Sequence, residues 1–151
     1  NFFVPNTFGP GDHTDPNKTH AINGMILRMI KAQRAGDKEF EVWGTGNPIR
    51  EWGYIDDVVE ILARGATIAE DLTYPVNIAQ NKGYSVKESA QLIAKAIGFQ
   101  GNLVFNTKYQ DGAPIKIMDD GKFRKLFPDF VFTEHELGIR EAVNYYKSVL
   151  D

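Results

Sequence analysis

The chain has 151 residues and a formal net charge of −3, with 42% of its residues hydrophobic and 25% charged. This length is enough for one domain with a hydrophobic core, and the acidic balance argues against a general nucleic-acid-binding protein. The chain has no cysteine, no apolar run as long as a membrane span and no visible signal peptide, which excludes disulfides and zinc–thiolate sites and predicts a cytoplasmic protein.

The first predicted element is an apolar strand over residues 1–5, followed by a polar loop and a helix. The loop, residues 6–19, is rich in the turn and cap residues Gly, Pro, Asp and Asn. Thr19 is expected to cap the helix, which begins near His20. Loops that join a strand to a helix are where α/β folds place ligands. Because the chain begins without Met and inside a strand, we expect it to be a fragment of a longer protein.

The helix after this loop has an apolar face at positions i, i+3, i+4, i+7 and i+8, formed by Ile22, Met25, Ile26, Met29 and Ile30. The opposite face carries His20, Gly24, Arg28 and Lys31. Because Gly24 has no side chain, His20 and Arg28 border a small notch that could bind an anion and move a proton. On spacing alone, an ordinary solvated helix face is the preferred interpretation. Leu27 is expected toward this polar side, and therefore at the surface.

Short strands are predicted on either side of a turn, after the helix ends near Gly36. The strands cover residues 40–43 and 52–55, and the turn between them, residues 44–48, favours a hairpin-like pair. Asp56 is expected to cap the next helix. The apolar face of that helix would be formed by Ile55, Val58, Val59, Leu62 and Ala66.

The second half of the chain continues the alternation of strands and helices. Ser85 with Glu88, and Thr133 with Glu136, have the spacing of capping boxes at the starts of two helices. The other predicted elements are a strand over 75–79, a helix end at Gly98, a strand over 103–105, a polar loop over 106–114 and a short helix over 121–127. This alternation predicts an α/β fold.

Six separated motifs carry a family resemblance. In chain order they are NTFGP at 6–10, DPNKTH at 15–20, VWGTGNPIREW at 42–52, YIDDV at 54–58, NIA at 77–79 and DGAPIK at 111–116. Together they resemble the C-terminal part of the extended short-chain dehydrogenase/reductase superfamily, with its NAD-dependent epimerases and dehydratases, nearest to nucleotide-sugar epimerases of the GDP-fucose synthase kind. Phe8 stands where the family usually has Tyr, and Ile115 stands in place of an arginine.

The resemblance implies a C-terminal part of an extended Rossmann-fold reductase/epimerase, with the last strands of the parallel sheet plus a small mixed α/β substrate-binding lobe. Residues 1–151 would be a single C-terminal substrate-binding portion, without the N-terminal cofactor-binding domain. The glycine-rich loop of the superfamily is missing, and none of the six tyrosines is followed four positions later by the lysine of its Tyr-x-x-x-Lys pair. We therefore expect NAD or NADP to be bound mainly by the missing domain, and this chain alone to be inactive.

The resemblance also implies roles for individual residues. His20 matches the histidine that acts as an acid in epimerisation. Asn6 matches the segment that approaches the nicotinamide end of the cofactor. The positions that match contacts to the GDP-sugar are Arg28, Trp43, Arg50, Asp111 and Lys116. Arginines suit a diphosphate, an indole offers a stacking face, and an imidazole exchanges protons near neutral pH.

Simpler interpretations remain for some of these residues. Trp43 would be a core residue, and Arg50 a structural partner of Asp56 or Asp57. His13 and His135 match no family position and are assigned no function.

The expected function is the substrate-binding region of an NAD(P)-dependent nucleotide-sugar epimerase, dehydratase or reductase. Its expected partner is a nucleotide-diphosphate sugar, with no nucleic acid, membrane or metal, and the parent enzyme is expected to be a homodimer. The alternative is a stand-alone, non-catalytic module that binds a nucleotide sugar or a protein partner.

Overall fold

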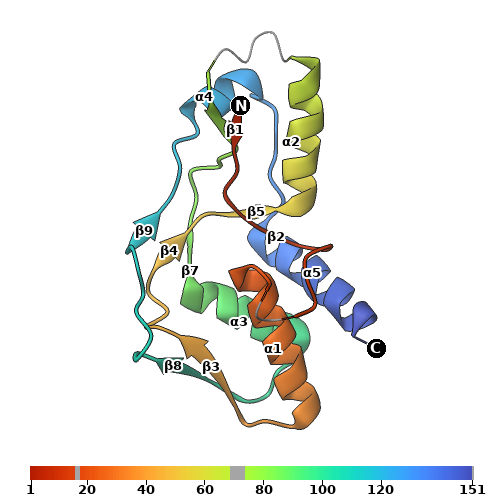
Figure 1. Ribbon diagram of the computed structural model, residues 1–151, viewed down its shortest axis with the longest axis vertical. Coiled ribbons are helices and arrows are strands. Elements are labelled where there is room, and N and C mark those ends of the chain that lie inside the picture. The colour runs from red at the N-terminus through yellow and green to blue at the C-terminus, as the bar shows by residue number, and fades with distance from the viewer. Residues whose placement is uncertain (16–17, 69–73, 151) are drawn as a thin grey trace.

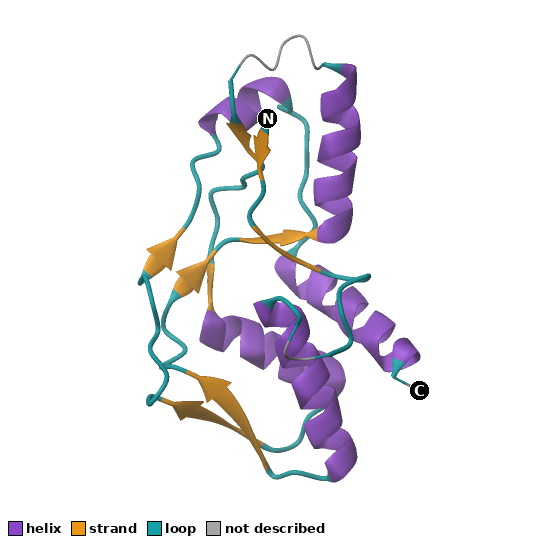
Figure 2. Cartoon of the chain, in the orientation of Figure 1, coloured by secondary structure: helices purple, strands orange, loops and turns teal. Residues whose placement is uncertain are grey.

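The computed structural model describes residues 1–15, 18–68 and 74–150. Its helices are α1 (Ala21–Ala35), α2 (Ile55–Thr67), α3 (Val86–Ile97), α4 (Gly121–Leu126) and α5 (His135–Val149). Its strands are β1 (Phe2–Phe3), β2 (Asn6–Phe8), β3 (Glu39–Trp43), β4 (Ile49–Arg50), β5 (Trp52–Tyr54), β6 (Val76–Asn77), β7 (Tyr84–Ser85), β8 (Asn102–Asn106) and β9 (Ile115–Lys116). Figures 1 and 2 show α1, α3, β3 and β8 toward one end of an elongated chain, and α2, α4, β1 and β6 toward the other.

The larger hydrophobic core lies among α1, α3 and α5. Helix α1 buries the whole predicted apolar face, which is Ile22, Met25, Ile26, Met29 and Ile30. Leu27 is also fully buried, so the expectation that it lies at the surface is wrong. The physical reason is that α1 contacts α3, α5, β2 and β3, and is therefore buried around more of its circumference than a single stripe.

Three helix ends agree with local sequence signals. Helix α1 ends at Gly36, whose left-handed backbone (φ 75°) suits glycine. Ser85 and Glu88 form the predicted capping box at the start of α3, and Gly98 ends that helix in the same left-handed conformation. These signals involve neighbours in sequence, so they do not depend on the rest of the fold.

The predicted side-chain caps of α1 and α2 are wrong. His20 rather than Thr19 occupies the N-cap position of α1, and its side chain makes no cap hydrogen bond. Tyr54 occupies that position in α2, which places Asp56 inside the first turn. An acidic residue there still interacts favourably with the helix dipole.

The start of α5 differs from the predicted capping box because Thr133 has another partner. Glu134 is the N-cap, without a side-chain cap bond. The Thr133 hydroxyl and N–H donate to the Asp57 carboxylate at 2.8 and 2.9 Å. Burial raises the pKa of Asp57, and these two hydrogen bonds act in the opposite direction. The contact joins the start of α5 to the first turn of α2.

The strands pair mostly in parallel with distant segments. The predicted strand over residues 1–5 is present only as β1, which pairs with β6, and a further strand, β2, pairs with β5 within the segment predicted as a loop. The predicted hairpin of 40–43 with 52–55 is wrong, since β3 pairs with β8 and β5 with β2. Strand β4 lies between antiparallel β7 and parallel β9. The α/β class is confirmed, and parallel pairing explains why the partners are far apart in sequence.

A second hydrophobic cluster joins α2, β6 and α4. Val58 and Ile61 of α2 are buried in it, whereas Val59 and Leu62 are 57% and 44% exposed. The predicted apolar face of α2 is therefore only partly buried. A side chain at Gly65 would collide with the ring of Phe2, so this glycine allows β1 to approach the helix closely. No helix in the described ranges has the length and apolar character needed to cross a membrane.

Candidate functional site

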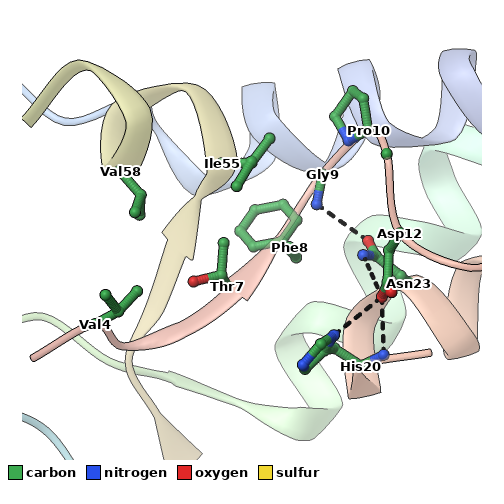
Figure 3. Close-up of a pocket in the computed structure, with 11 residues that line it drawn as sticks. Val4, Thr7, Phe8, Gly9, Pro10, Asp12, His20, Asn23, Ile55 and Val58 are labelled. Carbon is green, nitrogen blue, oxygen red and sulfur yellow. Dashed lines mark hydrogen bonds and ion pairs between the residues drawn. The ribbon is translucent and has the colours of Figure 1, made fainter. Parts of the chain in front are cut away.

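A cavity of about 430 Å³ lies where the β2 strand passes into the loop before α1 (Figure 3). Its apolar lining includes Val4, Phe8, Ile55 and Val58. Its polar lining includes Thr7, Asp12, His20 and Asn23. Strand β2, the loop that follows it and the starts of α1 and α2 therefore bring one imidazole and one carboxylate to the edge of an apolar hollow.

A second cavity, of about 230 Å³, lies on the other side of His20. It is lined by His20, Gly24 and Arg28 from α1, and by Val42 and Trp43 from β3. The notch predicted from the spacing of α1 is therefore present, and β3 closes one side of it. His20 lines both cavities and therefore lies between them.

Trp43 is a surface residue, 52% exposed, so its interpretation as a core residue is wrong. Its indole stacks on Tyr109 at 5.1 Å between ring centroids, and its Nε1–H donates to Glu41 at 3.0 Å. The Arg28 guanidinium lies over the indole and also donates to the backbone carbonyl of Glu41. The indole is held in a fixed orientation at the rim of the smaller cavity.

Arg50, Asp111 and Lys116 form a separate polar group on the β4–β9 pair. Arg50 pairs in register with Lys116, and its guanidinium donates to the Asp111 carbonyl at 3.2 Å. The Asp111 carboxylate accepts from the hydroxyl and N–H of Thr45 at 2.6 and 2.7 Å. These two hydrogen bonds lower the pKa of Asp111, with a smaller contribution from Arg50.

In the described part of the chain, the interpretation of Arg50 as a structural partner of Asp56 or Asp57 is wrong. Arg50 donates to the carbonyls of Ile49 and Asp111, while Asp57 accepts from Thr133. The Arg50 guanidinium is therefore bonded to the loop that carries Asp111, and both residues are only partly buried.

Asn6 lies at a third hollow, of about 330 Å³, which it shares with Lys116 and Glu51. Its side-chain amide donates to the Glu51 carbonyl at 3.4 Å. The buried Glu51 carboxylate accepts from the N–H groups of Gln80 and Met118, both at 2.7 Å. Glu51 thus joins β5 to the segments that follow β6 and β9, and it fixes the wall of this hollow.

Sequence reasoning missed two polar residues of the larger cavity. Asp12 is one of the turn residues of the loop over 6–19, with no further predicted role, and Asn23 has none, although an Asn inside the apolar run of a helix is a recognisable signal. Asp12 accepts a hydrogen bond from the His20 ring at 3.1 Å, and Asn23 donates to the same carboxylate oxygen at 3.1 Å. Among the described residues no group of three His, Asp or Glu side chains is arranged to hold a metal ion.

The other two histidines lie outside this arrangement. His13 is exposed, and only its backbone N–H donates to Asp12. His135 is buried, with its ring stacked on Tyr84 and its Nε2 3.0 Å from the Ser89 hydroxyl. It lines neither of the cavities beside His20.

Comparison with known proteins identifies the family of this chain. The sequence profile of the NAD dependent epimerase/dehydratase family matches residues 1–79. The chain belongs to this family.

Two relatives similar to this chain carry the same name. The chain is 34% identical over 150 residues to a probable GDP-L-fucose synthase of Drosophila melanogaster, covering 93% of this chain and 46% of the relative. It is 30% identical over 129 residues to the GDP-L-fucose synthase of Escherichia coli (strain K12), covering 80% and 40%. The chain spans less than half the length of these curated relatives.

The solved structures similar to this one support the fold assignment. A GDP-L-fucose synthetase from Naegleria fowleri superposes with a TM-score of 0.89 at 30% identity, covering 97% of this chain and 45% of that one. The same enzyme has been solved bound to NADP. The expected resemblance, to part of an extended Rossmann-fold epimerase/reductase, is confirmed.

Proposed function

We propose that this chain is the C-terminal substrate-binding portion of an NAD(P)-dependent nucleotide-sugar epimerase/reductase, acting on a GDP-sugar as its GDP-L-fucose synthase relatives are named to do. The observation that carries the proposal is the position of His20 between two cavities, one bordered by Arg28 and Trp43 and the other by the β1–β2 segment. A sugar bound between the cavities would expose its carbon atoms to the imidazole.

Charge and stacking support a nucleotide sugar as the ligand. Arg50 and Lys116 lie side by side on paired strands and supply two positive charges for a diphosphate. Arg28 and the exposed indole of Trp43 supply a cation and a flat apolar face for the sugar or the base. The Asp111 carboxylate, held by Thr45, would accept from hydroxyl or amino groups of the ligand.

His20 would serve the proton-transfer step at a carbon next to a ketone. An imidazole carries a proton to or from carbon efficiently because its pKa lies near neutral pH. The His20 side chain is 74% exposed, so it is accessible to a ligand in either cavity. As the proton leaves the imidazolium, the new C–H bond forms and the ring becomes neutral.

The residues around the larger cavity fit one end of a nicotinamide cofactor. Val4, Phe8, Ile55 and Val58 give it an apolar lining suited to a flat ring, and Asn6 lies in the adjoining segment with an amide that can pair with a carboxamide. The cofactor would supply the hydride for reduction of the ketone. The glycine-rich loop that holds a dinucleotide diphosphate is not in this sequence, so the rest of NAD or NADP would be bound by an N-terminal domain.

The parent protein would be a cytoplasmic homodimer, and this chain alone would have no turnover. The names of the relatives favour an enzyme portion over a stand-alone binding module. An isolated chain that converts a GDP-sugar with NADPH, after contaminating full-length enzyme has been removed, would overturn this assignment.

The proposed function is tested by His20→Ala in the full-length protein. General acid–base catalysis contributes about 10²–10⁴-fold, so kcat should fall by that factor while KM changes little. His13→Ala is the matched control, because it removes an exposed histidine from the same loop. If kcat survives in His20→Ala with its fold intact by thermal melting, the histidine is only a helix-end residue and the proposal fails.

A further inference from the structure

One carboxylate oxygen of Asp12 collects three hydrogen bonds. Its Oδ2 accepts from the backbone N–H of His20 at 2.9 Å, lies 3.1 Å from the ring Nδ1 of His20 and accepts from the Asn23 amide at 3.1 Å. The other oxygen accepts from the N–H of His13 at 2.8 Å. The Asp12 side chain is 14% exposed, whereas that of His20 is 74% exposed, so the carboxylate is the fixed member of the pair.

The carboxylate is itself oriented from inside the protein. Asn23 is 2% exposed, and its side-chain oxygen accepts from the N–H of Gly9 at 3.1 Å. This contact sets the amide so that its NH₂ group points at Asp12, as Figure 3 shows. The Gly9 carbonyl accepts in turn from the hydroxyl of the fully buried Tyr146 at 3.4 Å. Helices α1 and α5 thus hold the loop from both sides.

The protonation state of Asp12 follows from these contacts. Partial burial raises its pKa, but the hydrogen bonds from His20, Asn23 and His13 outweigh this and hold the pKa well below its usual range. An ionised carboxylate can only accept hydrogen bonds. At 3.1 Å from such an acceptor, Nδ1 of His20 must carry the ring proton.

We propose that Asp12, oriented by Asn23, is the positioning residue that fixes His20 as the Nδ1–H tautomer and leaves Nε2 to exchange the proton with substrate. This inference rests on the proposed function of His20. In the acid step, the Nε2–H bond of the imidazolium breaks as the C–H bond next to the ketone forms. The neutral ring that remains keeps its Nδ1 proton, which Asp12 accepts as a hydrogen bond, while Figure 3 shows the other ring nitrogen turned away from the carboxylate.

The tautomer is measured directly by ¹⁵N NMR of the imidazole in the chain itself, with no need for activity. In the unaltered chain the neutral His20 ring should be protonated at Nδ1. In Asp12→Asn the acceptor-only partner is lost, so the fraction protonated at Nδ1 should fall. Asp37→Asn, which makes the same charge change at the exposed far end of α1, should leave the tautomer as it was. An unchanged tautomer in Asp12→Asn would overturn the inference.

Kinetics in the full-length protein separate this inference from the proposed function. Asp12→Asn should lower kcat by roughly 10–100-fold, less than His20→Ala, with KM little changed, because the proton carrier remains but is misoriented. Asp12→Glu keeps the charge and should restore part of kcat, which also covers the case where Asp12→Asn folds poorly.

Failure of the proposed function and failure of the inference about Asp12 give different results. If His20→Ala leaves kcat intact, the proposed function fails whatever the tautomer. If His20→Ala lowers kcat while Asp12→Asn and Asp12→Glu leave both kcat and the tautomer unchanged, only the role of Asp12 fails.

Discussion

The guanidinium carbon of Arg28 lies 4.4 Å from the ring centroid of Trp43, at the rim of the cavity beside His20. The contact joins the middle of α1 to the end of β3. A cation held against an indole in this way presents charge and a flat surface to the same ligand. A ligand in this cavity should therefore contact both Arg28 and Trp43.

We expect GDP to bind the isolated chain and to quench the fluorescence of Trp43. Arg28→Gln should weaken this binding, because a hydrogen bond to a charged group contributes about 1.5–3 kcal/mol, or roughly 10–100-fold in the dissociation constant. The measurement is a fluorescence titration with GDP, repeated with isothermal calorimetry.

The chain offers a matched pair of controls for this titration. Trp43→Phe should abolish the quenching, whereas Trp52→Phe should retain it, because Trp52 is only 6% exposed. The Trp52 Nε1–H has no hydrogen-bond partner among the described residues, so its replacement leaves none of them unpaired. Quenching that disappears in Trp52→Phe and persists in Trp43→Phe would place the nucleotide elsewhere.

Replacing Arg50 should have a different effect from replacing Arg28, because the Arg50 guanidinium already donates to two backbone carbonyls. In the full-length protein Arg50→Ala should raise KM for the GDP-sugar by roughly 10–100-fold with kcat little changed, since a diphosphate contact is present in both ground and transition states. Arg140→Ala, an exposed arginine on α5, is the control. A sharply lower melting temperature with an unchanged KM would mean that Arg50 only supports the Asp111 loop.

Helices were predictable from this sequence because their signals are local. The Ser85–Glu88 capping box and the left-handed Gly36 and Gly98 each involve residues within one turn of the helix end. Where a cap residue has a distant partner, as Thr133 has in Asp57, the local signal failed. Tertiary contact then decides the conformation.

Strand pairing and burial could not be predicted in the same way. Trp43 pairs with Asn106 and Tyr54 pairs with Phe8, so each strand has a partner that its own residues do not specify. Leu27 was misplaced for a related reason, since its burial depends on which elements surround α1. Pairing across long loops is a property of the whole chain.

The residues proposed for the site come more from resemblance than from residue spacing. Spacing gave the notch around Gly24, whereas Arg50 and Lys116 were recognisable only through the family motifs. Asp12 was missed because it lies in a loop, where sequence spacing does not predict a contact with His20. It meets His20 and Asn23 only when the loop folds back onto the start of α1.

Acid should destabilise the chain through His135. Burial against Tyr84 and Ser89 lowers the pKa of this histidine from 6.5 to about 4, with Glu88 opposing the shift and Lys82 adding to it. Between these two values the unfolded chain binds a proton that the folded chain does not. The free energy of unfolding should therefore fall as the pH drops from 6.5 to 4, by about 3 kcal/mol for this group.

The contribution of His135 is isolated by comparing variants in urea unfolding at a series of pH values. His135→Gln keeps a partner for the Ser89 hydroxyl but does not titrate, so its stability should depend less steeply on pH in this window. His13→Gln, at an exposed site, should keep the slope of the unaltered chain. Equal slopes in all three would rule out a buried, uncharged His135.

Strand β1 and helix α2 expose apolar side chains. Phe3 is 59% exposed on a strand whose partner among the described residues is β6, and Val59 and Leu62 are exposed on α2. A strand with an open edge and an apolar face favours association. In the longer protein that we propose, an N-terminal domain would cover this surface, so the isolated chain should self-associate as its concentration rises. Phe3→Ser combined with Leu62→Ser should reduce this association in light scattering, whereas Val149→Ser, at an exposed valine of α5, should not. A chain that stays monomeric over a wide concentration range and binds no hydrophobic dye would show that this surface needs no partner.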